Sequence, residues 1–274
     1  MNIIIIIESV RNKHTKENSP SDTCLHEDGK TYKPEGDGLF NAERYFYCES
    51  TIIKTRTIWK ICIFINIFHS HNTNGGGAIA ISENFENKLD IKNCAFSNIS
   101  DTNEGGAIYF NSNKKSINIK NCTFDHSISS KDGNSIYIAQ SNGNLITISE
   151  CHFIDCGTSP TNYVININCQ KFDFLDNEIV FTDISKSCGC IKSNQCNEHK
   201  YERNIFRNAC VEFTDHSAGI DESNPSNSNK IVITENTFDG ISGPCEGRCF
   251  YVNFAQTDIN VDNNTIQNCL QRAF

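Results

Sequence analysis

A cluster of cysteines with one histidine is the part of the sequence whose residue types are best suited to chemistry. Cys188 and Cys190 are followed by Cys196 and His199, a Cys-x-Cys-x5-Cys-x2-His spacing. Thiolates and imidazoles are zinc ligands, and a structural zinc site needs four of them in a tetrahedron. The same residues suit a disulfide, or free thiols in an irregular loop. These three alternatives stay open, and we assign no metal and no cofactor.

A second cysteine pair lies further along the chain. Cys245 and Cys249 stand in the turn Gly-Pro-Cys-Glu-Gly-Arg-Cys, which is flexible enough to close a small disulfide loop. The chain has 15 cysteines in 274 residues, a count that is high for a cytosolic protein and odd. At least one thiol is therefore left without an intramolecular disulfide.

An internal repeat positions these side chains. The segment Leu89–Phe96 recurs at Ile117–Phe124, Ile146–Phe153, Ile231–Phe238 and Ile259–Ile266. Its last apolar position recurs in steps of 28, 28, 29, 26, 27, 32 and 28 residues. A fixed period of this length is typical of a solenoid. The members of this apolar ladder are Phe68, Phe96, Phe124, Phe153, Ile179, Phe206, Phe238 and Ile266.

A second repeated segment runs in step with the first. Gly76–Ile81 recurs as Gly105–Phe110, followed by weaker copies. Each period therefore holds two short strands with alternating apolar residues, separated by Asn/Asp/Ser/Gly turns. Winding the chain into coils lets each strand pair in parallel with its equivalent, and parallel crossovers are right-handed. We predict an all-β fold, a right-handed single-stranded parallel β-helix of about eight to nine coils with a period near 28 residues.

A column of Asn and Cys residues lies two places before the apolar ladder. We expect an inward-turning corner there, where asparagine side chains hydrogen-bond along the stack. Cysteine takes the same place as a small hydrophobic residue, which makes the three cysteines of the column structural. The column consists of Asn66, Cys94, Cys122, Cys151, Asn177, Asn204, Asn236 and Asn264.

The repeat also divides the chain. Residues 45–274 are predicted to form the β-helix domain, which ends in mid-repeat, and residues 1–44 form an N-terminal segment. Val10–Gly38 lacks both ladders and is polar, so we expect it to be loose. A solenoid end needs a cap, and Ile3–Ile7 is a possible capping strand.

The charge balance excludes some partners. Lys and Arg number 24 against 33 Asp and Glu, a net charge of −9. Nucleic acid and anionic membranes require a basic surface, so we expect neither as a partner. Ile3–Ile7 lacks the flanks of a signal peptide, and Ile58–Phe68 is too short and too polar to span a bilayer. The sequence thus shows no export signal, and membrane attachment needs an anchor absent from this chain.

The paired Gly-Gly-Ala-Ile and Asn-Cys-x-Phe elements resemble the repeats of a known family. At this spacing, Gly105–Ile108 and Asn93–Phe96 are similar to repeats of polymorphic outer membrane proteins. They are equally similar to those of right-handed β-helix surface proteins from trichomonad-type protists. The resemblance covers about Tyr45 to Phe274. It implies a pectin lyase-like β-helix, an extracellular or cell-surface location and a role in adhesion.

Right-handed β-helices also house carbohydrate-active enzymes. Asp125-His126 resembles the Asp-His pair of polysaccharide lyases, but it occupies a turn that reads Ser97-Asn98 and Asp239-Gly240 in other coils. Its repeat position therefore explains it. Arg203 and Arg207 flank one strand end, where solvated turn residues are expected. No cluster of carboxylates for acid and base chemistry is visible.

Two functions follow, from different classes. We expect a non-enzymatic, adhesin-like surface or interaction protein that presents an extended solenoid face to a protein or glycan partner. The alternative is a carbohydrate-active β-helix enzyme of the polysaccharide lyase or glycoside hydrolase class. A groove with three or more converging Asp or Glu side chains plus Arg or Lys favours the enzyme. Charges spread evenly over the turns favour the binding protein.

Overall fold

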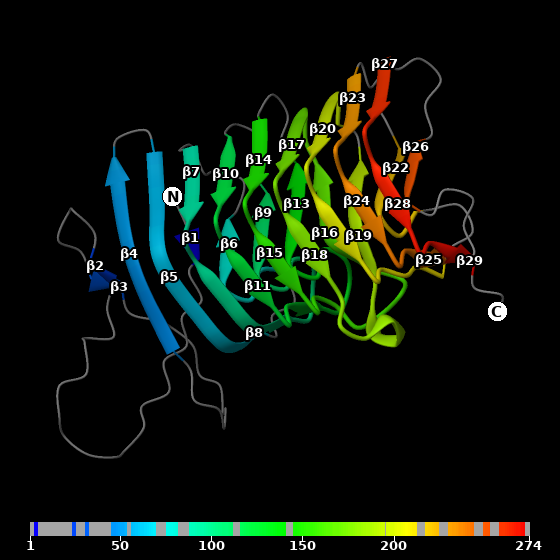
Figure 1. The fold of residues 1–274 in the computed structure, drawn as a ribbon. Helices are drawn as coiled ribbons and strands as arrows, with labels where there is room; N and C mark the ends of the chain where they lie inside the picture. Colours follow the sequence, from blue (N-terminus) through cyan, green and yellow to red (C-terminus); the bar gives the residue numbers. More distant parts are fainter. Residues whose placement is uncertain are drawn as a thin grey trace.

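The computed structural model is an all-β parallel solenoid with a period near 28 residues, as the sequence predicts. It describes residues 45–53, 56–69, 75–81, 88–111, 116–140, 145–194, 196–212, 217–224, 230–243, 249–252 and 258–271, and three two-residue strands before them. Within these residues the only helix is a 3₁₀ turn, η1 (Ile184–Lys186). The coils stack side by side into a rod (Figure 1).

Each coil contributes three parallel strands, one more than the repeat predicts. The predicted strand Leu89–Phe96 is interrupted at Asn93, which has a left-handed backbone with φ of 53°. A single left-handed residue turns the chain, and asparagine tolerates this conformation better than most residues. The interruption recurs once per coil, at Asn121, Glu150, Asp176, Arg203, Glu235 and Asn263.

The strands form three parallel lines, two of which belong to one continuous sheet. One line of the 17-stranded sheet is β7 (Lys88–Lys92), β10 (Ile117–Lys120), β14 (Leu145–Ser149), β17 (Lys171–Leu175), β20 (Glu198–Glu202), β23 (Lys230–Thr234) and β27 (Asp258–Asp262). The other is β8 (Ala95–Asp101), β11 (Thr123–Asp125), β15 (His152–Ile154), β18 (Glu178–Val180), β21 (Ile205–Arg207), β24 (Thr237–Asp239) and β28 (Thr265–Gln267).

The third line forms a separate sheet across the core. It consists of β6 (Ile79–Ile81), β9 (Ile108–Asn111), β13 (Ile136–Gln140), β16 (Tyr163–Asn168), β19 (Gly189–Asn194), β22 (Ile220–Asn224) and β26 (Phe250–Val252). Short additional strands pair at the corners: β12 (Ile128–Ser129) with β8, and β25 (Ser242–Gly243) with β29 (Leu270–Gln271).

An antiparallel hairpin lies at the N-terminal end of the rod. It consists of β4 (Tyr45–Ile53) and β5 (Arg56–His69), and β5 then pairs in parallel with β7 and β8. Strand β1 (Ile3–Ile4) pairs antiparallel with β6, and β2 (Cys24–Leu25) pairs with β3 (Thr31–Tyr32). The solenoid has about six turns, slightly fewer than the eight to nine coils predicted.

The apolar ladder lies inside the rod. Phe96, Phe124 and Phe153 pair in register and have no exposed surface. Their rings are parallel, with adjacent centroids 4.7 Å apart. Ile179, Phe206, Phe238 and Ile266 continue the register, although Ile266 in the last coil is 54% exposed.

Phe68 and Asn66 are misplaced by the sequence analysis. The ring that stacks on Phe96 is Phe64, at 4.8 Å, whereas Phe68 pairs with Ser100 and is 42% exposed. Asn66 has φ of 54° and lies opposite the turn residue Asn98, not opposite Cys94. The first step of the ladder is therefore longer than the 28 residues that the sequence suggested.

The Asn column forms the predicted hydrogen-bonded stack. The Asn204 side-chain oxygen accepts the backbone N–H of Asn177 at 2.9 Å, and Asn236 accepts that of Asn204 at 3.0 Å. The Asn204 side-chain amide donates to the carbonyl of Phe174 at 2.8 Å. Cys94, Cys122 and Cys151 take the same position and are buried. The Cys151 sulfur accepts the N–H of Cys122 at 3.4 Å, a weaker version of the same contact.

Glycine is required where the chain enters the separate sheet. Gly105 has φ of 69°, and a Cβ at this position would collide with the carbonyl oxygen of Ile108. Gly76 and Gly133 occupy the equivalent positions of the neighbouring coils, also with positive φ. The Gly-rich segments of the repeat therefore supply residues that can adopt a positive φ.

Apart from β2 and β3, the predicted loose segment Val10–Gly38 lies outside the described residues. The boundary between residues 44 and 45 stays a prediction, with β4 beginning at Tyr45. No helix among the described residues is long and apolar enough to cross a membrane.

Candidate functional site

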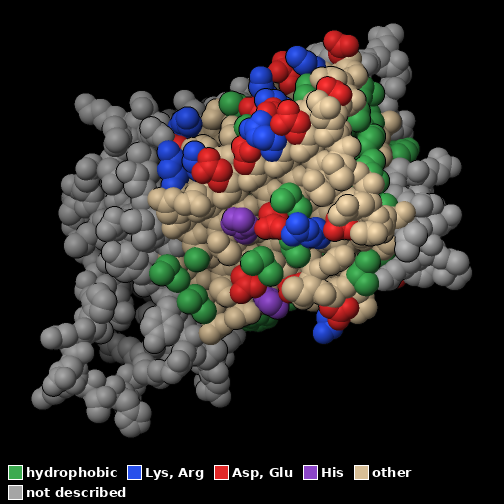
Figure 2. All heavy atoms as spheres, in the orientation of Figure 1, with side chains coloured by type: hydrophobic (Ala, Val, Ile, Leu, Met, Phe, Trp, Pro, Cys, Tyr) green, Lys and Arg blue, Asp and Glu red, His purple; other side chains and the backbone are tan. Residues whose placement is uncertain are grey.

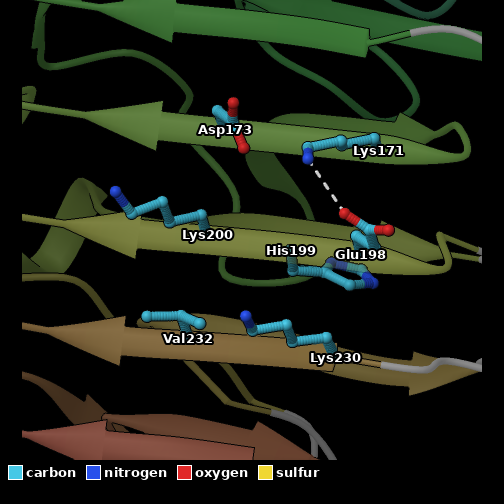
Figure 3. A pocket seen from close by; sticks show the side chains of 7 residues that line it. All are labelled: Lys171, Asp173, Glu198, His199, Lys200, Lys230 and Val232. Atoms are coloured by element: carbon cyan, nitrogen blue, oxygen red, sulfur yellow. Dashed lines mark ion pairs between the residues drawn. The ribbon is translucent and has the colours of Figure 1, made fainter.

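A shallow groove lies on the outer face of the solenoid, over three consecutive coils. It has a volume of about 280 Å³ and runs across β17, β20 and β23 (Figure 3). In Figure 2, Lys, Arg, Asp and Glu side chains are interleaved in a band over this part of the sheet. The groove is lined by Lys171, Asp173, Glu198, His199, Lys200, Lys230 and Val232.

The strand register arranges the groove charges in two columns. Lys171, Glu198 and Lys230 stack in one column, and the Lys171 ammonium lies 2.9 Å from the Glu198 carboxylate. Asp173 and Lys200 stack in the other, where Lys200 pairs with Glu202 of its own strand. The pairing of Lys171 with Glu198 raises the pKa of Lys171.

Asp173 is the distinctive group of the groove. Its side chain is half-buried, and within the described part of the chain it has no ion pair or hydrogen bond. Burial raises the pKa of its carboxyl, while the charges of Lys171 and Lys200 oppose that shift. The groove thus offers a partly desolvated acceptor between ammonium donors. Such a set can hydrogen-bond hydroxyl, amide or ammonium groups of a partner.

The inner side of β20 carries a buried polar cluster, which we define as Cys169, Ser193, Cys196, His199, Tyr201 and Glu222. Strand alternation places His199 and Tyr201 inward while Glu198 and Lys200 face the groove. The His199 Nδ1 atom lies 2.8 Å from the Glu222 carboxylate, with both side chains 1% exposed. The Tyr201 hydroxyl donates to the same carboxylate. Polar groups therefore replace the isoleucines that fill these positions in other coils.

Strand alternation places Glu222 in the core, two residues after the buried Ile220 and in register with Val252 of the next coil, and a β-bulge lies beside it. The register of β19 and β22 shifts between Lys192 and Asn194, so that β22 has one extra residue opposite β19. Bulges are common next to functional sites. Its neighbour Asp221 is also buried and accepts a hydrogen bond from the Tyr163 hydroxyl at 2.8 Å.

Burial and the neighbouring charges shift the pKa values of the side chains in the buried cluster. Burial alone lowers the pKa of His199, but the adjacent Glu222 carboxylate raises it to about 9. Burial raises the pKa of Cys196, yet the hydrogen bond from Cys169 and the charge of His199 bring it below its usual value. The pKa of Cys169 is raised by burial. The cluster therefore favours an imidazolium paired with Glu222 beside an acidified thiol.

The structure separates the four residues proposed as zinc ligands. Cys196 and His199 belong to the buried cluster. Cys188 lies elsewhere, donating to the carbonyl of Cys156 at 3.3 Å, and Cys190 is buried. Among the described residues no three His, Cys, Asp or Glu side chains are arranged to hold a metal ion. The thiol nearest to Cys196 is Cys169, at a sulfur–sulfur distance of 3.2 Å.

The second predicted cysteine pair is only partly within the described residues. Cys245 lies outside them, so its disulfide with Cys249 stays a prediction. The Cys249 sulfur lies 3.4 Å from the sulfur of Cys269 in the next coil.

His126 and Arg203 occupy repeat turns, and Asp125 and Arg207 are the last residues of β11 and β21. His126 has φ of 51°, like Asn98 and Asp155 at the equivalent turns, and its Nδ1 atom lies 2.6 Å from exposed Asp125. The Arg203 Nε atom pairs with Asp176 at 2.6 Å, and Arg207 pairs with Glu178 at 2.8 Å. These ion pairs join neighbouring coils at the surface. The structure thus places all of these side chains where the repeat predicts.

Sequence reasoning named Cys196 and His199 but missed the other members of the buried cluster and the other groove residues. One signal for the cluster was available, because His199 and Tyr201 stand where other coils have Ile117 and Ile119. Polar residues at two inward positions of one strand indicate a partner in the core. Glu222 carried the same signal, because it stands two residues after Ile220, at the inward position that Ile138 and Ile167 fill in other coils.

Comparisons of this chain with protein-family models, with curated proteins and with solved structures gave no match.

Proposed function

We propose that this chain is an interaction protein that binds a protein or glycan partner through the outer groove of β17, β20 and β23. The observation that carries the proposal is Asp173, a partly desolvated carboxylate between Lys171 and Lys200 with no partner in the described residues. Elsewhere on the described surface, ion pairs between coils hold charged side chains such as Lys120 with Glu150, Arg203 with Asp176 and Arg207 with Glu178. The groove is thus the place where polar groups remain open to a ligand.

The composition of the groove favours binding over catalysis. Only two carboxylates line it, and one of them, Glu198, is paired with Lys171. A glycoside hydrolase needs two carboxyl groups in separate roles, and a lyase needs acids for a cation and a base for the proton. Asp173 alone supports neither. A parallel solenoid also suits binding, because its stacked strands present an extended surface to one partner.

The family resemblance supplies the finer part of the proposal. The repeats resemble those of polymorphic outer membrane proteins and of trichomonad-type surface proteins. We therefore propose an adhesin-like role at the cell surface, where a groove that binds a glycan or protein of another cell is of use. The proposal assigns no cofactor and no nucleic acid partner.

Binding of the purified chain to cells tests this function. The labelled chain is added to intact eukaryotic cells, to protease-treated cells and to cells treated with glycosidases. The proposal predicts saturable binding that one of the two treatments abolishes, and the effective treatment shows whether the partner is protein or glycan. Absence of saturable binding to untreated cells would contradict the adhesin-like role.

Paired variants test the groove itself. The double variant Asp173→Asn, Lys230→Gln removes one negative and one positive charge from the groove. The control Glu150→Gln, Lys120→Gln makes the same change at an exposed ion pair of 2.8 Å outside it. We expect the groove variant to lose about tenfold in affinity, roughly 1.4 kcal/mol, and the control to bind like the parent chain. Equal affinity of the two variants would show that the partner binds elsewhere.

A further inference from the structure

We propose that Cys169 and Cys196 form a redox-active dithiol, in which Cys196 is the nucleophile and Cys169 resolves its oxidised form into a disulfide between two coils. The two sulfurs lie 3.2 Å apart in adjacent coils of the solenoid. Equivalent positions of parallel strands are about 4.8 Å apart, within the range of Cα separations that a disulfide bridges. Closing the bond therefore requires little movement of the backbone.

Hydrogen-bond donors converge on the Cys196 sulfur. It receives the hydroxyl of Ser193 at 3.1 Å, the backbone N–H of Cys169 at 3.3 Å and the thiol of Cys169. Donors directed at a sulfur stabilise a thiolate, the form that attacks oxidants and disulfides. The three contacts come from two coils, so they are fixed by the stacking of the solenoid.

The histidine of the cluster adds a positive charge nearby. The Ser193 hydroxyl lies 3.2 Å from His199 Nδ1, linking the imidazole to the Cys196 sulfur. His199 Nε2 donates to the carbonyl of Cys196 at 3.0 Å, and Glu222 lies beside Nδ1. The imidazolium thus has acceptors on both nitrogens. This order of carboxylate, imidazole and thiol is typical of activated cysteines.

The stacked cysteines of the Asn/Cys column lack this environment. Cys122 and Cys151 are joined by a backbone N–H to sulfur hydrogen bond of 3.4 Å, and burial raises the pKa of Cys122. No imidazole or carboxylate contacts these sulfurs in the described residues. Cys122 and Cys151 therefore provide an internal control of equal burial.

The reaction is a two-electron oxidation by hydrogen peroxide, an oxidant small enough to enter a packed core. The Cys196 thiolate attacks one peroxide oxygen, the O–O bond breaks, and the departing hydroxide takes up a proton to become water. Cys196 is left as a sulfenic acid. The Cys169 sulfur attacks the Cys196 sulfur, and the displaced hydroxyl leaves with the Cys169 proton as a second water. Two thiols and one peroxide thus give one disulfide and two waters.

Peptide mapping of the whole folded chain tests the disulfide. The reduced chain is treated with hydrogen peroxide at neutral pH, its remaining thiols are alkylated, and digested peptides are identified by mass spectrometry. We expect a peptide pair joined through Cys169 and Cys196, while Cys122 and Cys151 stay as thiols. Mapping also separates this bond from any formed between Cys249 and Cys269. Full alkylation of Cys169 and Cys196 in peroxide-treated folded protein would overturn the proposal.

Single variants distinguish the nucleophile from the resolving thiol. In Cys169→Ser, Cys196 is expected to accumulate as a sulfenic acid that a dimedone-type reagent traps. In Cys196→Ser, Cys169 is expected to stay unreacted, because nothing acidifies its thiol. Both serine variants are checked for unchanged circular dichroism before oxidation. Equal trapping of the two variants would refute the assignment of Cys196 as nucleophile.

A variant of Glu222 tests whether its carboxylate activates Cys196 through His199. Glu222→Gln removes the group that holds the proton on His199 and should slow oxidation of Cys196 at neutral pH by about tenfold, equal to one unit in the thiol pKa. The slowing should vanish at alkaline pH, where the thiol ionises unaided. Glu150→Gln makes the same change at an exposed carboxylate outside the buried cluster and should react at the parent rate. An equal rate for Glu222→Gln and the parent chain at neutral pH would contradict activation by His199.

Discussion

Phe124 illustrates how single residues hold the coils together. Its ring has no exposed surface and lies between Phe96 and Phe153, with centroids 4.7 Å away on each side. Phe124→Ala removes contacts to both neighbouring coils, so we expect the free energy of unfolding to fall by about 3–5 kcal/mol. Denaturant titration measures the loss. Phe68→Ala is the control, because Phe68 is 42% exposed, and it should cost less than about 1 kcal/mol.

A larger loss for Phe68→Ala than for Phe64→Ala would contradict the register at the N-terminal end. Phe64, not Phe68, stacks on Phe96 at 4.8 Å.

His199 gives the stability of the chain a defined pH dependence. Between about pH 6.5 and 9 the folded chain keeps a proton on His199 that the unfolded chain releases. The unfolded state binds fewer protons, so the stabilisation is complete below about pH 6.5 and is lost as the pH rises through 9. We expect a loss of up to about 3 kcal/mol over this range.

The measurement compares Cys196→Ser with the double variant Cys196→Ser, His199→Gln by urea denaturation at several pH values. The serine removes the opposing titration of the neighbouring thiol, and Glu222, Tyr201 and Cys169 are common to both proteins. The stability difference between the two should shrink as the pH rises. A difference that is constant with pH would refute a protonated His199.

At the inward-turning corner between strands, asparagine should stabilise the fold more than cysteine does. Asn204 is buried and joins three coils, since its side chain contacts Asn177 and the carbonyl of Phe174 in the preceding coil and Asn236 in the next. Asn204→Ala leaves those groups without partners in the core and should destabilise the chain by about 2–4 kcal/mol. Cys151→Ala at the same corner should cost about 1 kcal/mol, because its sulfur makes only weak hydrogen bonds. Thermal and denaturant unfolding of both variants would show equal losses if the column were merely space-filling.

The strands show how far the sequence predicts structure. Alternating apolar residues and glycines established the parallel coils and the inward rings of Phe96, Phe124 and Phe153. The sequence analysis chose the wrong phenylalanine of β5 as the first member of the apolar ladder. Both Cys62-x-Phe64 and Asn66-x-Phe68 fit the repeat motif, and the apolar residues around them do not distinguish the two. The third strand per coil was missed because it is divided from its neighbour by one left-handed residue.

The candidate site depended on contacts that the repeat does not encode. The outward positions of Asp173 and Lys200 in the groove follow from the strand register once it is known. The register does not predict that these two residues form no ion pair with each other. The Cys169–Cys196 contact joins residues 27 apart across the weakest part of the repeat. Alternation from Ile220 predicts the inward position of Glu222, but its contacts with His199 and Tyr201 join two different sheets, and the repeat does not encode them.

At the scale of the whole rod, stability should fall toward the last coil. Ile259, Val261 and Ile266 occupy inward positions of the repeat, yet they are 48%, 43% and 54% exposed, because no described coil covers them. In a solenoid each coil is stabilised by its neighbours, so the outermost one opens most readily. We expect amide hydrogen exchange in β27 and β28 to be faster than in β14 and β15. Uniform protection along the rod would contradict this.

A solenoid that binds its partner along one face should leave that partner chemically intact. The most direct measurement incubates the purified chain with pectin-like and other acidic polysaccharides, with and without Ca²⁺, and counts unsaturated and reducing sugar ends. The proposed function predicts no ends above background, because only two carboxylates line the groove and one of them, Glu198, is paired with Lys171. Release of sugar ends that Asp125→Ala or Asp173→Asn abolishes would contradict it and establish the carbohydrate-active enzyme instead.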